Sequence, residues 1–88
     1  MATLLARGDA LLSAGDVTAA RLFYERAADA GGGVGAIRLG ETLDPAFLNR
    51  IRLRGVSGDV NAASYWYHRA RDLGIADADA LLKPLGTK

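Results

Sequence analysis

The chain of 88 residues contains no cysteine, one histidine and two prolines. Without cysteine there is no disulfide, no thiolate metal site and no cysteine nucleophile, and a single histidine excludes the usual zinc ligand sets. No apolar run approaches the roughly 18 residues of a transmembrane helix. No basic segment precedes the apolar part of the N-terminus, so we expect no signal peptide. These absences leave the compartment open.

Residues typical of β-strands are also scarce. Valine and isoleucine together number seven, whereas half of the chain is hydrophobic and rich in alanine and leucine. Alanine and leucine favour helices, and strands favour β-branched and aromatic residues. The composition therefore predicts an all-α fold, and the length predicts a single domain. The net charge of +1 gives no bulk attraction to nucleic acid or to an anionic membrane.

One segment occurs twice. GDVTAARLFYERAADAG at 15–31 and GDVNAASYWYHRARDLG at 58–74 are identical at 10 of 17 positions, 43 residues apart. In each copy an Asp is placed to cap the start of a helix and a Gly to end it. The spacing of Val, Ala, Tyr and Ala between these ends predicts one buried face per helix. We therefore expect Tyr24 and Tyr67 in equivalent core positions, and Trp66 facing an adjacent helix pair.

Further helices are expected around this repeated segment. The pattern predicts a first helix at about 3–14, a third after Gly35, a fourth starting at Pro45, and later helices at 59–73 and 76–83, the last ending before Pro84. The alternation in Arg50–Arg54 is typical of a strand. Since a lone strand has no partner, we interpret it as a helix end that runs into a loop.

The order of these patterns resembles two related families. Leu4, Gly8 and Leu11, followed by Ala20, Tyr24 and Ala27, resemble the tetratricopeptide pattern, although Leu11 and Gly32 stand where an aromatic and a proline are usual. The second copy, from Ala36-x-x-Leu39-Gly40 to Gly74, is similar to Sel-like repeats (SLR). The insertion DPAFLNRIRLR makes it eleven residues longer between its helices.

This resemblance implies a short α-α superhelix of two helical hairpins and a C-terminal capping helix. The expected divisions of the single domain 1–88 are repeat 1 at about 3–31, repeat 2 at about 34–74 and the cap at about 76–83. Such families imply protein–protein interaction or scaffolding, commonly as modules of larger bacterial proteins, without catalysis or cofactors. Two alternatives stay open. One is self-association through apolar flanks at both ends, with residues 31–35 as a hinge. The other is a structural cap of a longer parent protein.

Three short motifs are similar to motifs of enzymes or of adhesion proteins. His68, with Ser64 and Asp72 at helical spacing, lacks a complete nucleophile arrangement and is interpreted as a surface histidine. Gly31-x-Gly33-x-x-Ala36 matches a loose dinucleotide fingerprint, but a helix precedes it where that fingerprint needs a strand. Arg7-Gly8-Asp9 is an integrin-type tripeptide inside a predicted helix. We therefore expect a chain that is not an enzyme.

Charge is distributed unevenly along the chain. Residues 50–71 carry a net charge of +4, whereas residues 1–49 carry −2. A local basic surface favours a protein or peptide partner with an acidic surface over nucleic acid, because arginine pairs with carboxylates through two hydrogen bonds. The candidates for partner contacts are Arg38, Glu41, Arg50, Arg52, Arg54, Arg69 and Arg71.

Overall fold

The computed structural model describes residues 2–53 and 55–86, and within them the chain is all-α, as predicted. Its elements are α1 (Ala2–Ser13), α2 (Val17–Asp29), α3 (Gly33–Leu43), α4 (Pro45–Arg50), α5 (Val60–Asp72), α6 (Ala78–Leu82) and the 3₁₀ turn η1 (Lys83–Leu85). No strand occurs in this described part, and residues 51–52 form a turn after α4. The interpretation of the alternating segment as a helix end is therefore confirmed up to residue 53.

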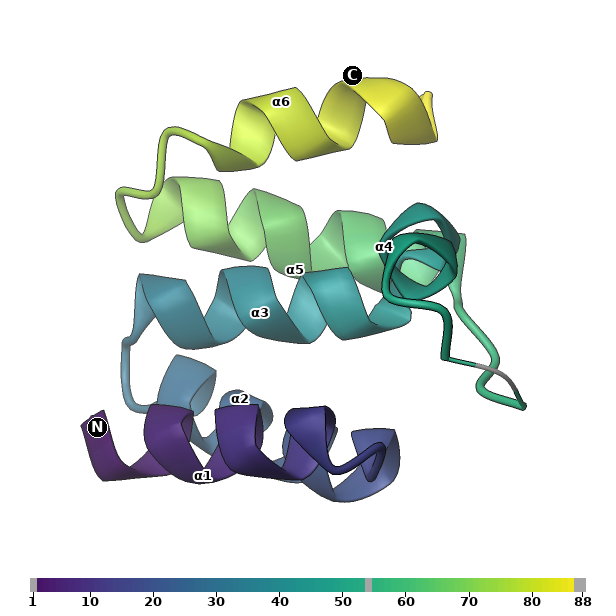
Figure 1. The fold of residues 1–88 in the computed structure, drawn as a ribbon. Helices are drawn as coiled ribbons and strands as arrows, with labels where there is room; N and C mark the ends of the chain where they lie inside the picture. Colours follow the sequence, from purple (N-terminus) through teal and green to yellow (C-terminus); the bar gives the residue numbers. More distant parts are fainter. Residues whose placement is uncertain (1, 54, 87–88) are drawn as a thin grey trace.

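The helices form a stack in which α3 is central. Helix α1 packs on α2, α3 packs on both α2 and α5, and α6 packs on α5. Figure 1 shows α1 and α6 at opposite ends of this stack, with the short α4 turned across the end of α3. The loop that follows α4 returns to α3, where the Asp59 main-chain N–H donates to the Leu43 carbonyl at 2.7 Å.

The repeated segment caps its helices as its sequence predicts. The Asp16 carboxylate accepts from the Ala19 N–H at 3.1 Å, and the Asp59 carboxylate accepts from the Ala62 N–H at 3.0 Å. Gly31 and Gly74 follow the helix ends with φ of 92° and 98°, a region that costs glycine no steric strain. The start and end of both copies are thus set by local chemistry.

Two predicted helix boundaries are wrong. Helix α3 begins at Gly33, not after Gly35, so part of the expected hinge at 31–35 is helical. Gly35 lies in the helix because it packs directly on α2, where a side chain would not fit. Helix α6 begins at Ala78 instead of 76, and η1 continues the chain past Pro84, because a proline near the start of a helical turn needs no N–H partner.

The two tyrosines of the repeated segment have equivalent surroundings. Both rings are buried, and each lies against a glycine of the helix before it: Tyr24 on Gly8 of α1, and Tyr67 on Gly40 of α3. A β-carbon on either glycine would come within 3.0 Å of the facing ring. The prediction of equivalent core positions is therefore confirmed for these side chains.

In the end helices α1 and α6, the exposed apolar residues are alanines and the leucines are partly or fully buried. The exposed residues of α1 are small or charged, as are Asp79 and Ala80 of α6. None of the large hydrophobic side chains found exposed in the described ranges belongs to α1 or α6.

Candidate functional site

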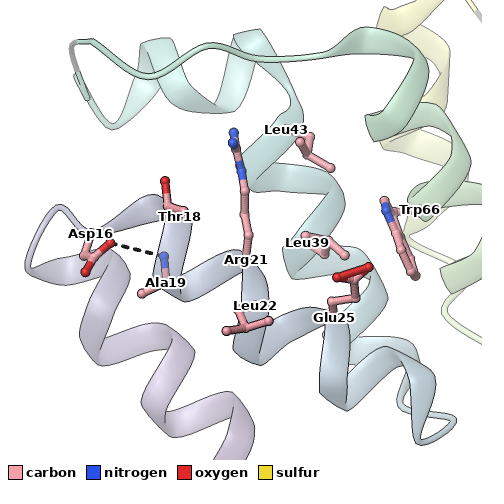
Figure 2. A pocket seen from close by; sticks show the side chains of 9 residues that line it. All are labelled: Asp16, Thr18, Ala19, Arg21, Leu22, Glu25, Leu39, Leu43 and Trp66. Carbon is pink, nitrogen blue, oxygen red and sulfur yellow. Dashed lines mark hydrogen bonds between the residues drawn. The ribbon is translucent and has the colours of Figure 1, made fainter.

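An open groove lies between α2 and α5, with α3 at its base. Its volume is about 570 Å³, and Figure 2 shows α2 on one side, Leu39 and Leu43 of α3 beneath, and Trp66 of α5 on the other side. The residues that line it are Asp16, Thr18, Ala19, Arg21, Leu22, Glu25, Leu39, Leu43 and Trp66. A concave, mainly apolar surface with a few charged groups is the usual form of a binding site.

Trp66 joins the groove to the core. The indole is partly buried and packs against the cluster of Ala20, Tyr24 and Leu39 from α2 and α3, so it faces an adjacent helix pair, as predicted. Its ring meets the Tyr65 ring edge-on, with centroids 5.1 Å apart. Trp66 therefore has one side in the core and another in the groove.

Large apolar side chains are exposed both in the groove and beside it. Leu22 is 48% exposed and lines it, and Tyr65, beside Trp66, is 59% exposed. These two residues occupy the same position in the two copies of the repeated segment. Both copies therefore present a large hydrophobic side chain to solvent where a surface helix usually carries a polar one.

Arg21 is held at one end of the groove. Its Nη2 donates to the Thr42 carbonyl at 2.5 Å and to the Ser57 carbonyl at 3.0 Å, which ties α2 to α3 and to the loop before α5. Its Nε is buried and has no hydrogen-bond partner among the described residues. Burial lowers the pKa of Arg21.

The carboxylates of the groove are in different situations. Asp16 caps α2 through the Ala19 N–H. Glu25 is exposed, and it forms no ion pair with any residue that the structure describes. Arg21 lies four residues earlier on the same helix, a spacing that permits an ion pair, but its guanidinium is bound to main-chain carbonyls instead.

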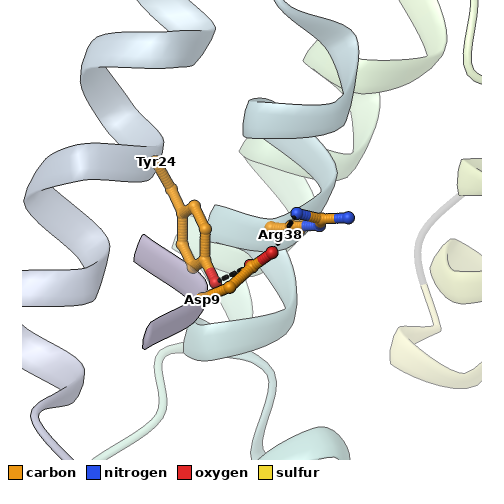
Figure 3. Close-up of polar contacts among 3 residues, drawn as sticks. All are labelled: Asp9, Tyr24 and Arg38. Atoms are coloured by element: carbon orange, nitrogen blue, oxygen red, sulfur yellow. Dashed lines mark hydrogen bonds and ion pairs between the residues drawn. The ribbon is translucent and has the colours of Figure 1, made fainter. Parts of the chain in front are cut away.

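A second polar cluster connects α1, α2 and α3. The Tyr24 hydroxyl donates to Asp9 at 2.5 Å, and Asp9 forms an ion pair with Arg38 at 2.7 Å, as Figure 3 shows. In the next pair of helices, the Tyr67 hydroxyl donates to Asp44 at 2.9 Å. Burial, followed by the hydrogen bond to the carboxylate, raises the pKa of both tyrosines.

The two carboxylates that accept these hydrogen bonds differ in burial, which gives a prediction. Asp44 is 4% exposed, whereas the Asp9 side chain is 48% exposed and retains Arg38 as a partner. We expect Tyr67→Phe to lower the free energy of unfolding by about 1.5–2 kcal/mol and Tyr24→Phe by less than about 1 kcal/mol, because a buried carboxylate loses more when a donor is removed. Urea denaturation of both variants checks this, and equal losses would contradict it.

The residues predicted from charge lie in two groups. Helix α5 runs antiparallel to α3: its start meets Leu43, and the residues after its end, Leu73 and Ile75, lie against Gly33. The 13 residues of α5 span about 20 Å. Arg50 and Arg52 therefore lie near the start of α5, whereas Arg69 and Arg71 lie near its other end, so these four arginines do not form a single basic surface.

The individual candidates have different environments. Arg38 is engaged with Asp9, and Arg71 lies 3.5 Å from Asp79. Burial raises the pKa of Glu41, with Arg38 and Arg50 acting in the opposite direction. The remaining candidates are Arg50, which lies over the Phe47 ring at 5.8 Å, the exposed Arg52 and Arg69, and Arg54, which lies outside the described residues.

None of these candidates lines the groove. The groove itself was not predicted from the sequence. The one available signal was the exposed hydrophobic residue at the same position in both copies. No cluster of His, Cys, Asp and Glu suited to a metal ion occurs among residues 2–53 and 55–86. No helix in that part is both long enough and apolar enough to cross a bilayer. Comparisons of the chain with protein-family models, with curated proteins and with solved structures gave no match.

Proposed function

We propose that this chain is a non-catalytic protein-interaction module of the helical-repeat type, and that it binds a segment of a partner protein in the groove between α2 and α5. The observation that carries the proposal is the groove itself, where Leu22, Leu39 and Trp66 present apolar surface from three different helices. Apolar surface that converges in an open groove is suited to the side chains of another protein.

The resemblance to tetratricopeptide and Sel-like repeats supports the same function, since those families imply protein interaction. Among the described residues, the large exposed hydrophobic side chains lie outside α1 and α6, which favours the groove over these end helices as the contact surface. The prediction of an acidic partner applies to the arginines outside the groove and stays a prediction. So does the role of a structural cap in a longer parent protein.

Selection from a library of displayed random 12-residue peptides that lack tryptophan tests the proposal. The chain has a single tryptophan, Trp66, so its fluorescence reports directly on peptides that enter the groove. We expect Leu22→Glu to raise the Kd of the enriched peptides at least about tenfold, because it removes apolar contact and places a charge in the interface.

Val60→Glu is the matched control. Val60 is 42% exposed on α5 and does not line the groove, so a glutamate at that position should leave the Kd within about twofold. Circular dichroism of both variants verifies that the fold is retained. The proposal fails if no peptide is enriched, or if the enriched peptides bind Leu22→Glu as tightly as the unmodified chain.

A further inference from the structure

We infer that the groove recognises a basic residue of the partner segment, a lysine or arginine whose cationic group lies between Glu25 and Trp66. This inference rests on the proposed function, because it names the chemistry of the segment that enters the groove. Figure 2 shows the Glu25 carboxylate of α2 pointing into the groove, on the side that Trp66 of α5 lines. A carboxylate and an indole therefore border one space.

The Glu25 carboxylate is available to a partner. Within the described part of the chain it has no ion-pair partner, although Arg21 lies one helical turn away. The Arg21 guanidinium is held by the Thr42 and Ser57 carbonyls, at the other end of the groove. In Figure 2 it points away from Glu25. Because Arg21 is held elsewhere, the Glu25 carboxylate lines the groove together with the Trp66 ring and has no cation as its partner.

A lysine or arginine side chain is complementary both to the Glu25 carboxylate and to the apolar surface around it. Its charged group is attracted both by the carboxylate and by the π-face of an indole, the aromatic side chain that binds cations best. Its aliphatic stem can lie on apolar surface such as Leu39 while the charge stays near water. An acidic segment would be repelled by Glu25, and a wholly apolar one would desolvate its carboxylate without compensation. The occupant to which the chemistry points is therefore a basic, apolar segment of another protein.

The peptide selection tests this directly. We expect the enriched peptides to share a lysine or arginine next to apolar residues. Synthetic copies in which citrulline replaces arginine, or norleucine replaces lysine, should bind about three- to fivefold more weakly, the range of a partly exposed ion pair. Binding of the basic peptides should also weaken as salt is raised, because exposed charges are screened.

Variants of Glu25 separate this inference from the proposed function. Glu25→Gln should weaken the basic peptides by the same three- to fivefold factor. Selection on Glu25→Lys should enrich Asp or Glu in place of the basic residue. Asp29→Asn is the matched control, since Asp29 is an exposed carboxylate of α2 that does not line the groove.

Three outcomes overturn the inference. If the peptides depend on Leu22 but carry no basic residue, or bind Glu25→Gln undiminished, the recognition of a cation is wrong while the interaction function stands. If no peptide is enriched, both fail. If light scattering finds a dimer that Glu25→Gln dissociates, the occupant is a second copy of this chain and the assignment to another protein is wrong.

Discussion

Replacing Asp44 by alanine is expected to lower the free energy of unfolding by about 2–4 kcal/mol, a large part of the total stability of a domain of this size. Asp44 has two structural roles. One carboxylate oxygen accepts the Ala46 N–H at 2.9 Å and so caps α4, and the other accepts the Tyr67 hydroxyl at 2.9 Å. Loss of the cap costs about 1 kcal/mol. Leaving the buried hydroxyl without an acceptor costs a further 1–3 kcal/mol or so.

Urea denaturation followed by circular dichroism measures this loss, and Asp16→Ala is the control. Asp16 caps α2 in the same way, through the Ala19 N–H, but is exposed, so its removal should cost only about 1 kcal/mol. Asp44→Asn, which keeps an acceptor oxygen, should lie between the two. Equal losses for Asp44→Ala and Asp16→Ala would mean that the contact with Tyr67 contributes nothing to stability.

The parts of the fold that could be predicted from the sequence are those set by neighbouring residues. The capping Asp16 and Asp59 act on N–H groups three positions later, so the pattern is visible in the sequence itself. The equivalence of Tyr24 and Tyr67 follows from identical spacing in two copies of one segment. Scarce β-branched residues predicted the helical class for the same reason, because helix propensity is a local property.

The parts that could not be predicted depend on contacts between distant residues. Helix α3 starts three residues earlier than expected because tertiary packing outweighs the low helix propensity of Gly33 and Gly35. The groove depends on Arg21, whose carbonyl partners Thr42 and Ser57 lie 21 and 36 residues away in the chain. No short-range pattern reveals that such an arginine leaves Glu25 without its usual partner.

Charge counted along the chain was misleading for a related reason. Residues 50–71 are strongly basic as a segment, but the segment includes nearly all of α5, and this helix places its last arginines at the end that lies far from α4. Counting charges along a sequence treats neighbours in the chain as neighbours in space. In a helical hairpin, residues of the two helices that are close in the chain are also close in space only near the turn.

Gly35→Ala is the second change expected to have a large effect, with a loss of about 2 kcal/mol in the free energy of unfolding. A β-carbon at Gly35 would lie 2.7 Å from the Ala27 Cβ, 2.8 Å from the Ala28 main-chain nitrogen and 3.0 Å from the Tyr24 carbonyl oxygen. Two of these atoms belong to the main chain of α2, so relief requires a whole helix to move. Overpacking of this kind typically costs 1–3 kcal/mol or so, occasionally more, and it exceeds the gain of about 1 kcal/mol that alanine brings to a helix.

Gly33→Ala is the matched control, two residues earlier in the same helix. Its β-carbon would meet the Ile75 Cγ1 at 2.7 Å and the Leu73 Cβ at 3.3 Å, but both atoms are side-chain atoms of the short segment after α5, which shifts more easily than the main chain of a helix. We therefore expect a change within about 1 kcal/mol for Gly33→Ala. Because α3 also forms the base of the groove, Gly35→Ala should weaken the groove peptides as well, whereas Gly33→Ala should not. If Gly35→Ala proves as stable as the unmodified chain, α2 and α3 do not pack as closely as the contact between Ala27 and Gly35 indicates. The shape of the groove between α2 and α5 would then be wrong as well.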